Sequence, residues 1–543
     1  MNDFKEIFEH HYTWIEGFMR NVRRYPEKTA LIDPLRKLTL NYKQLNAEVN
    51  RLANTLAAND FQPHDIVMIL LKNCPEFVYS YIAAQKMHGV CCPVSFRLSA
   101  GELAWAISDA RPRVFVYDVR FEETVKEALS LSSYQPCHVV VVGGKENAQA
   151  VTYREFVAEA TEAEPAFTCP YYIYDETLRL YTSGTTGRPK AVPLLSINEV
   201  LSAHDVMMEL PMNDGDVTMN TTPWFHRGGI HSAGPAVVFY AGASLVIMDK
   251  FNAVDTLKYV EQYHITYVIG VPTVLDALAD EQEQHPRNLA SIRGIIAMGS
   301  PLEREACMRY ELHLTPNIFN GYGTTETFWN TMLRPGDVIS HAGSAGKACV
   351  DDEVRVVKIY EDRKAEPDDL VAQDGSEVGE VIMCSPAKSP YCYHNNEGAS
   401  ADKYYKGFVY TNDLATWDEN QFITILGRMD DMIISSGENI YPAEVEAVLD
   451  AHPQVKESIV TSVPDKVRGQ IVTAYVVSTN PELTPEELDE FCKESPEIAN
   501  FKRPRYYRFV DSVPHNATGK RMHRDVKKQA AEDLKNNLLY RMK

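Results

Sequence analysis

Hydrophobic positions in the first half of the chain alternate between a helical and a strand-like spacing. Residues 42–59 repeat apolar positions at the spacing of an amphipathic helix, and residues 65–71 follow as a short apolar run. Residues 75–89 again have helical spacing, and residues 90–96 form a second apolar run. A similar alternation returns over residues 256–284. Strands that alternate with helices are typical of α/β proteins, so we predict a large N-terminal domain of layered α/β sheets.

The pattern changes twice in the second half of the chain. Short apolar strands separated by turns, such as residues 379–385 and 422–428, predict a small β-rich subdomain. Helices and strands then alternate again, from the helix expected at residues 442–452 onwards, and predict a compact α+β domain. We therefore expect an N-terminal domain over residues 1–428 and a C-terminal domain over residues 429–543.

Composition limits the class of protein. The 543 residues are too many for one compact core, and the formal net charge of −21 argues against nonspecific binding to nucleic acid or anionic membranes. The ten cysteines include no CxxC pair, which favours reduced thiols in a cytoplasmic protein over disulfides or a zinc site. The amino terminus lacks the apolar core of a signal peptide. The longest apolar run, residues 233–248, is shorter than the ~20 residues of a membrane span. We predict a buried strand–turn–strand there and no membrane span.

The stretch YTSGTTGRPKAVPL, from Tyr181 to Leu194, has the composition of an anion-binding loop that follows a strand. Gly184 and Gly187 allow tight backbone geometry, Lys190 supplies a positive charge, and backbone amides with nearby hydroxyl groups can surround a phosphate. The hydroxyl groups belong to Thr182, Ser183, Thr185 and Thr186. The order GTTGRPK differs from the spacing of a Walker loop. Taken alone, these residues are equally consistent with a surface loop that binds nothing.

This stretch resembles the phosphate-binding signature of the adenylate-forming superfamily, which includes acyl-CoA synthetases, luciferases and the adenylation domains of peptide synthetases. Other segments resemble the superfamily's further motifs in the same order, so the resemblance covers nearly the whole chain from about residue 26. They are PWFHRGG (223–229), NGYGTTET (320–327), GSAGK (343–347), YTNDLA (410–415), GRMDDMIISSGENIYPAEVE (427–446) and PHNATGKRMHR (514–524). One motif is moderately specific, whereas the ordered set is highly specific.

The resemblance implies an AMP-forming acid–CoA ligase. In this family a carboxylate attacks the α-phosphorus of ATP, which gives an acyl-adenylate and pyrophosphate, and a thiol then displaces AMP. The implied cofactors are ATP, Mg²⁺ and coenzyme A, and the C-terminal domain is expected to rotate about Asp430 between the two steps. Lys520 is expected to bridge the carboxylate and the α-phosphate, Glu326 to hold Mg²⁺, and His226 to act as a gate between the acyl pocket and the thiol tunnel. The alternatives are a surface lysine of a basic tail and an ordinary partly buried histidine.

The resemblance also implies a nucleotide site assembled from several loops. Tyr322 is expected to lie against adenine, Thr325 at the α-phosphate, Asp413 at a strand end beside the ribose, and Arg428 at the ribose or a phosphate. An Asp413 that only forms a turn and an interdomain Arg428–Asp413 ion pair are the alternatives. The remaining expected residues are Gly299, Ser300, Asn320, Gly321, Gly323 and Thr324 for the nucleotide, with Ser436 and Gly437 for the thiol tunnel.

The residues near the expected acyl pocket favour a short, medium-length, aromatic or alicyclic carboxylic acid. Met298 stands where many members of the superfamily have a small residue and would shorten the pocket. Phe328 and Trp329 would add flat apolar surface, although Met and aromatic residues at such positions are often simply core.

Two positions depart from the superfamily's pattern near the expected thiol tunnel and ribose site. Ile434 replaces a lysine that many relatives carry, so the phosphates of CoA are expected to rely on other cations. Lys502, Arg503 and Arg505 are the candidates by position and charge. Asn412 replaces a glycine beside the expected ribose ligand, which should shift that loop slightly.

Other functions stay open on the sequence alone. A stand-alone adenylation enzyme could load an acyl group onto a carrier protein, although the chain carries no carrier domain of its own. A luciferase-like oxidase is more remote. A nucleotide-binding regulator that has lost catalysis is opposed by the presence of Lys520 and Glu326. A homodimer is one assembly that the sequence leaves open.

Overall fold

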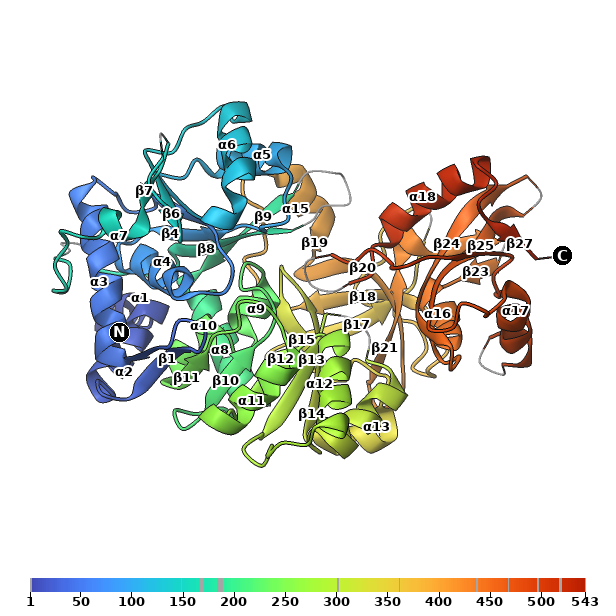
Figure 1. The fold of residues 1–543 in the computed structure, drawn as a ribbon. Helices are drawn as coiled ribbons and strands as arrows, with labels where there is room; N and C mark the ends of the chain where they lie inside the picture. Colours follow the sequence, from blue (N-terminus) through green and yellow to red (C-terminus); the bar gives the residue numbers. More distant parts are fainter. Residues whose placement is uncertain are drawn as a thin grey trace.

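The computed structural model of the protein describes residues 2–147, 149–166, 170–182, 189–299, 302–360, 362–435, 438–466, 468–495, 498–516 and 520–542. Within these ranges the chain forms two large sheets, a smaller sheet and a C-terminal sheet, all covered by helices (Figure 1). This arrangement confirms the predicted fold class, an α/β protein with a β-rich subdomain and a C-terminal α+β domain.

The first large sheet has the strand order β7-β6-β5-β3-β4-β8-β9. Its strands are β3 (Ile66–Leu70), β4 (Val90–Pro93), β5 (Val114–Asp118), β6 (His138–Val142), β7 (Val151–Thr152), β8 (Glu176–Thr182) and β9 (Lys190–Leu195). The helices in this part of the chain are α3 (Tyr42–Ala58), α4 (Pro75–Lys86), α5 (Ala100–Ala110), α6 (Glu122–Leu131) and α7 (Tyr153–Phe156). Val67 and Ile69 of β3 enter one core while Met68 enters another. Because the strand is buried on both faces, its sequence is an uninterrupted apolar run.

The second large sheet has the order β16-β15-β14-β13-β12-β10-β11-β1-β2. Its strands are β1 (Thr29–Asp33), β2 (Leu38–Asn41), β10 (Val217–Asn220), β11 (Ser244–Val246), β12 (Tyr267–Gly270), β13 (Gly294–Met298), β14 (Ile318–Thr324), β15 (Phe328–Leu333) and β16 (Lys347–Ala348). The helices beside it are α2 (Trp14–Arg24), α8 (Ser196–Glu209), α9 (Arg227–His231), α10 (Pro235–Ala241), α11 (Ala253–Tyr263), α12 (Pro272–Gln284), α13 (Arg304–His313) and α14 (Val338–His341). Helix α8 contacts β8 and β9, whereas α10 contacts α8 and β11, so these two helices lie between the large sheets.

The strand–turn–strand predicted for residues 233–248 is wrong in its first half. The segment forms helix α10, which begins at Pro235, turns at Gly242 with a φ of +80°, and continues as β11. Helix α10 is buried between the two large sheets and is apolar on all sides, so it shows no helical periodicity. A short apolar run of this kind cannot be assigned to a strand or to a buried helix from its pattern.

The smaller sheet follows in the chain and leads to the C-terminal sheet. It contains β17 (Glu353–Val357), β18 (Gly379–Cys384), β19 (Tyr404–Tyr405), β20 (Phe408–Trp417) and β21 (Ile423–Arg428), with helix α15 (Glu397–Lys403) beside it. The C-terminal sheet contains β22 (Ile433–Ser435), β23 (Glu438–Ile440), β24 (Val455–Asp465), β25 (Gly469–Ser478), β26 (Tyr506–Phe509) and β27 (Tyr540–Arg541). Its helices are α16 (Pro442–Asp450), α17 (Pro485–Glu494) and α18 (His523–Lys535).

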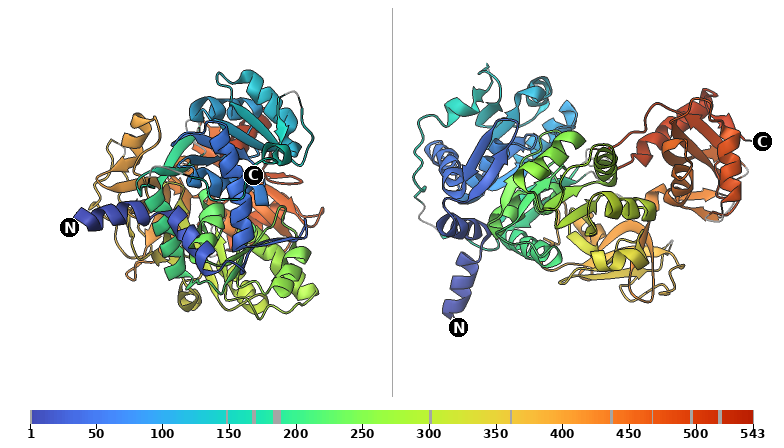
Figure 2. Two further views of the ribbon diagram at one scale, coloured as in Figure 1. Left: turned by 90° about the vertical axis from the view of Figure 1, so that its left-hand side faces the viewer. Right: turned by 60° about the horizontal axis from the view of Figure 1, so that its bottom comes forward.

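The passage from one sheet to the other runs through the short helix η3 (Met429–Asp431), which contains Asp430. The division at residues 428 and 429 stays a prediction. Figure 2 shows the C-terminal part, coloured orange to red, at one end of the molecule, and helix α1 (Asn2–His11) projecting from the body. No helix in the described part of the chain is long and apolar enough to cross a membrane.

Helix α8 carries a stripe of buried polar side chains at intervals of three or four residues, namely Glu199, Ser202, Asp205 and Glu209. The fully buried Lys388 donates to Asp205 at 2.8 Å, to Asp352 at 2.5 Å and to the carbonyl of Trp329 at 2.5 Å. The ammonium therefore joins α8 to β15 and to the loop that follows β16.

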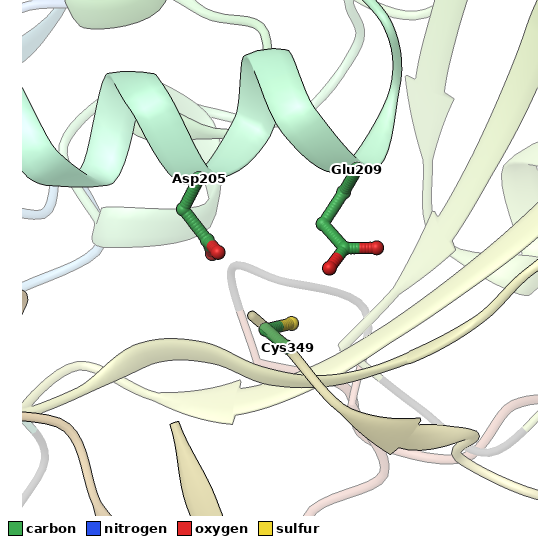
Figure 3. A group of neighbouring side chains, drawn as sticks. All are labelled: Asp205, Glu209 and Cys349. Atoms are coloured by element: carbon green, nitrogen blue, oxygen red, sulfur yellow. The ribbon is translucent and has the colours of Figure 1, made fainter. Parts of the chain in front are cut away.

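Among the described residues, Asp205, Glu209 and Cys349 lie close enough together to hold a metal ion (Figure 3). Asp205, however, is paired with Lys388, and both oxygens of Glu209 accept from Arg334, at 2.7 and 2.8 Å. Burial raises the pKa of the Cys349 thiol well above its ordinary value, so the thiol stays protonated and is a poor ligand. We interpret this group as part of a buried ion-pair cluster and not as a metal centre.

Replacing Lys388 by Met should lower the free energy of unfolding by about 3–5 kcal/mol, because Asp205 and Asp352 would keep buried carboxylates without a cation. Lys406→Met is the matched control, since Lys406 contacts Glu366 at 2.6 Å on the surface, and an exposed ion pair contributes little to stability. Urea-induced unfolding measures both variants. Equal losses would contradict a special contribution from the buried cluster.

Candidate active site

The turn between β14 and β15 holds the glutamate that was expected to bind magnesium. Glu326 is buried, and its Oε1 accepts a hydrogen bond from the Tyr393 hydroxyl at 2.5 Å. Burial raises the pKa of Glu326, but the charge of Lys403 and the hydrogen bond from Tyr393 outweigh this effect, so the pKa lies below its ordinary value. The carboxylate is therefore ionised at neutral pH, as a ligand of Mg²⁺ must be.

Lys190, at the base of the expected phosphate loop, lies over the ring of Tyr393. Lys190 is the first residue of β9 and pairs in register with Thr182, the last residue of β8. Its Nζ atom lies 5.2 Å from the centre of the Tyr393 ring. Lys190 and Glu326 therefore contact the same tyrosine. Eight expected site residues lie outside the described part of the chain, namely Ser183, Gly184, Thr185, Thr186, Gly187, Ser300, Ser436 and Gly437.

The expected ribose ligand Asp413 lies in the interior of β20 and not at a strand end, which corrects the prediction from sequence. It accepts hydrogen bonds from the Tyr322 hydroxyl at 2.7 Å and from Arg428 at 3.1 Å. Arg428 is the cross-strand partner of Asp413 on β21, so their ion pair joins two strands of one sheet and not two domains. Asn412 adopts a φ of +61°, a left-handed conformation that asparagine tolerates better than most residues.

The other residues expected from the NGYGTTET segment lie on β14 and in the turn that follows. Met298 of β13 pairs in register with Gly321, so Gly299, with a φ of +87°, lies next to this segment. The Asn320 side chain donates to the carbonyl of Ser344 at 3.1 Å. The hydroxyls of Thr324 and Thr327 lie 3.1 Å apart across the turn. The segment is thus a strand and a tight turn at the edge where β13 and β14 end.

Lys520 is held from both sides within the C-terminal domain. Its N–H donates to Oδ1 of Asn516 and its carbonyl accepts from the N–H of Asn516, both at 2.9 Å. The next residue, Arg521, contacts Glu446 at 2.9 Å and Asp450 at 2.5 Å. These contacts of Asn516 and Arg521 fix the backbone of Lys520 and restrict where its side chain can reach.

The Lys520 ammonium interacts electrostatically with residues of the N-terminal domain. The residue keeps exposed surface, yet the protein around its ammonium lowers the pKa of Lys520 by desolvation, while the charge of Asp413 raises it and that of Arg428 lowers it. The charge of Lys520 in turn contributes to a lowered pKa of His226. Lys520 thus interacts electrostatically with Asp413, Arg428 and His226, which belong to separate motifs.

The protonation state of His226 follows from its local geometry. His226 is the N-cap of α9, and its Nδ1 accepts from the Gly229 N–H at 3.1 Å, so the ring proton must lie on Nε2. Burial, with a smaller contribution from Lys520, lowers the pKa of His226 to about 4. The Nε2 atom is buried and has no hydrogen-bond partner among the described residues. At neutral pH the ring therefore offers one unused N–H donor.

The apolar residues expected at the acyl pocket also lie near His226. A Cβ atom at Gly228 would lie 3.2 Å from the Met298 sulfur and 3.6 Å from Nδ1 of His226, so Met298 fills the space beside the gate position. Phe328 and Trp329 stack with their ring centres 5.0 Å apart, and the indole packs on Gly321. These side chains form a flat apolar wall next to the β14 segment.

Two residues that the sequence analysis did not select have direct contacts at this site. Tyr393 donates to Glu326, and Arg227 donates to the carbonyl of Thr325 at 2.8 Å. Tyr393 lies in an irregular segment with no periodic or motif signal. Arg227 lies within the PWFHRGG segment, where a charged residue in an otherwise apolar, buried motif was the available signal.

The three cations suggested for the phosphates of CoA have different surroundings. Lys502 is paired with Glu444 at 2.6 Å, and Arg503 is paired with Asp489. For Arg505, burial and the nearby charges of Arg503 and Arg468 lower the pKa. Their role stays a prediction, as does that of Asp430, which is exposed in η3.

Comparisons with known proteins agree with this geometry. A family model described as AMP-binding enzyme matches residues 18–387, and one described as AMP-binding enzyme C-terminal domain matches residues 444–520. The 2-succinylbenzoate–CoA ligase of Bacillus licheniformis is 30% identical over 516 residues, which is 94% of this chain and 98% of that protein. The chain therefore belongs to the AMP-binding enzyme family, and the resemblance to adenylate-forming enzymes is confirmed.

Solved structures match over almost the whole chain. The O-succinylbenzoate coenzyme A synthetase of Bacillus subtilis, in complex with ATP and magnesium ion, matches with a TM-score of 0.81 at 29% identity and covers 94% of this chain and 99% of that chain. An anthranilate CoA ligase in complex with anthranoyl-AMP matches with a TM-score of 0.85 at 24% identity, covering 96% of this chain and 98% of that chain. The second match shows the fold alone.

The imidazole of His226 should titrate with a pKa of about 4 and stay neutral at pH 7. Removing the nearby positive charge by Lys520→Met should raise this pKa, because protonating the ring would no longer create a second cation beside the ammonium. Histidine-selective NMR titration measures the shift. Lys502→Met is the control, since that lysine is paired with Glu444. An unchanged His226 pKa in Lys520→Met would contradict the proximity of the two groups.

Proposed function

We propose that the protein is an AMP-forming acid–CoA ligase, which activates a carboxylic acid with ATP and then transfers the acyl group to coenzyme A. The observation that carries the proposal is the electrostatic interaction of Lys520, in the C-terminal domain, with Asp413, Arg428 and His226, which lie on other segments of the chain. A lysine amine placed there is suited to a reaction that brings two anions, a carboxylate and a triphosphate, into contact.

Each residue has a chemical task in the first step. The Lys520 ammonium would lie between the acid's carboxylate and the α-phosphate and reduce their repulsion. The Nε2–H of neutral His226 would donate to an oxygen of the same carboxylate or of the adenylate. Asp413, already fixed by Tyr322 and Arg428, would accept from the ribose hydroxyls. These interactions place the carboxylate oxygen next to phosphorus without any covalent step on the enzyme.

The residues at the turn after β14 fit a magnesium ion. Glu326 is buried, ionised and held by Tyr393, and the threonine hydroxyls of the turn lie beside it. When bound, Mg²⁺ would neutralise charge on the phosphates of ATP. Lys190 would contribute a further positive charge at the base of the phosphate loop.

For the acid, the packing of Met298 against Gly228 supports a short, medium-length, aromatic or alicyclic substrate. A long unbranched chain would have to displace the methionine thioether from beside His226. The stacked pair of Phe328 and Trp329 offers a flat surface to a ring. The 2-succinylbenzoate–CoA ligase named above is named for an acid that carries an aromatic ring, and this supports the same class.

The test is a panel of carboxylic acids incubated with the purified protein, ATP, Mg²⁺ and CoA, with AMP and acyl-CoA measured by mass spectrometry. We expect equal amounts of AMP and thioester, with benzoate-like and short acids preferred over long-chain fatty acids. Lys520→Met should slow acyl-adenylate formation by at least about 10²-fold. Lys502→Met, which removes a lysine paired with Glu444, should leave the rate of this step unchanged. No AMP with any acid would contradict the proposal. AMP only with a phosphopantetheinylated carrier protein would support the carrier-loading enzyme instead.

We further propose that the C-terminal domain turns about Asp430 between the two steps, because η3 is a short exposed connection between β21 and β22. Asp430→Pro should slow thioester formation from acyl-adenylate and CoA more than it slows adenylation. Glu419→Pro is the matched control, since Glu419 is the second residue of an exposed turn closed by the bond from Gln421 N–H to the Asp418 carbonyl, where proline is tolerated. Equal slowing of both half-reactions in Asp430→Pro would exclude the pivot.

A further inference from the structure

Arg227 is buried to a degree that is unusual for an arginine. Its exposed fraction is 2%, and burial lowers its pKa to about 9. None of the carboxylates in the described ranges forms an ion pair with it. An arginine that is removed from water without a paired carboxylate has lost solvation that must be replaced by other contacts. The groups that accept hydrogen bonds from Arg227 therefore indicate which parts of the structure it holds in place.

The guanidinium of Arg227 donates to backbone carbonyls on two different segments. One terminal nitrogen, Nη1, donates to the carbonyl of Thr325 at 2.8 Å, and the other, Nη2, donates to the carbonyl of Lys388 at 2.6 Å. Nη2 also donates to the Ser202 hydroxyl of α8 at 3.2 Å. The planar fork of the guanidinium thus fixes the distance between the β14–β15 turn and the loop that carries Lys388.

We propose that Arg227 is a positioning residue that holds the Thr325–Glu326 turn where its carboxylate can bind Mg²⁺ together with ATP. The inference rests on the proposed function, because it assigns the metal ligand to Glu326. Arg227 bonds the carbonyl of Thr325 and not the carboxylate of Glu326, so it fixes the turn while leaving that carboxylate available. Tyr393 fixes the Glu326 side chain separately, by donating to its Oε1.

The cation and the carboxylate still interact at longer range. The charge of Glu326 raises the pKa of Arg227, after the larger contribution of Glu199. Arg227 also lies 5.7 Å from the centre of the Phe328 ring, the first residue after the turn. The arginine therefore contacts Thr325, immediately before Glu326, and Phe328, two residues after it. Losing it would release the turn on both sides.

The experiment measures the affinity of the full-length protein for ATP by calorimetry, once with Mg²⁺ and once with EDTA. Arg227→Met should weaken binding in Mg²⁺ by about tenfold to a hundredfold, the factor that corresponds to one hydrogen bond from a charged donor, and should change binding in EDTA by less than about threefold. Arg227→Lys keeps the charge but can replace only part of the fork, and should lie between the wild type and Arg227→Met.

Arg334→Met is the matched control. Arg334 is bonded to Glu209 of the same helix α8, at 2.7 and 2.8 Å, but has no hydrogen bond to the turn. The Arg334→Met variant should leave the Mg²⁺-dependent gain in ATP affinity unchanged. Thermal unfolding of all three variants shows whether each is folded. If Arg227→Met is not folded, the comparison of Arg227→Lys with the wild type still tests the proposal.

Several results would overturn the proposal. Equal weakening of ATP binding with Mg²⁺ and with EDTA, or the same weakening in Arg334→Met, would assign Arg227 a merely structural role. An unchanged Mg²⁺-dependent affinity with an altered ranking of the acids would assign it to the acyl pocket. A wild-type protein whose ATP binding ignores Mg²⁺ would overturn both this inference and the metal site. If the wild type forms no AMP but Arg227→Met loses the Mg²⁺-dependent gain, the proposed function fails and the positioning role is supported.

Discussion

The pairing of buried charges along helix α8 is the constraint that the active-site geometry depends on. The stripe on α8 faces donors from different segments, and two of these donors, Arg227 and Lys388, also bond to a part of the site. Glu199 accepts from Tyr81 and Thr177, Ser202 from Arg227, Asp205 from Lys388 and Glu209 from Arg334. Burying an unpaired charge costs several kcal/mol, so the donors have little freedom to move away. Because Lys388 bonds Trp329 and Arg227 bonds Thr325, the positions of β15 and of its turn follow from this pairing.

The contacts that bring Lys520 to this fixed site are of a different kind. Arg97 donates to the carbonyl of His515 at 3.4 Å across the two parts of the chain, a long and weak hydrogen bond. Burial raises the pKa of Glu303, at the start of α13, and the charge of Asp450 raises it further, while that of Arg521 lowers it. Arg521 is itself paired with Glu446 and Asp450, so Glu303 has no ion pair of its own among the described residues. These contacts suit the proposed rotation of the C-terminal domain between the two steps, in contrast with the buried pairs around α8.

The sequence predicted the strands and helices best where the pattern was regular or the motif was specific. The helices expected at residues 42–59 and 442–452 correspond to α3 and α16, and the apolar run at residues 65–71 contains β3. The prediction from sequence failed at α10. This helix is buried on all sides and has no polar face, so its sequence shows no helical periodicity. It also misplaced Asp413, because the YTNDLA segment continues through the strand β20 where a strand end was expected. Tyr393 and Arg227 were missed since their importance arises from contacts across long sequence separations, with Glu326 and with Thr325, which no local pattern encodes.

Positive charges from different parts of the chain would link substrate binding to domain position in the proposed reaction. A chain with a net charge of −21 repels a triphosphate at long range, so binding requires local cations. Lys190 lies on the first large sheet, Arg428 on the smaller sheet, and Lys520 in the C-terminal domain. The full set of charges exists only when the C-terminal domain is docked as it is here. A bound triphosphate would favour this docked position, and departure of pyrophosphate would remove much of the attraction. In the proposed reaction, that loss of charge would release Lys520 at the moment when the thiol needs access to the acyl-adenylate.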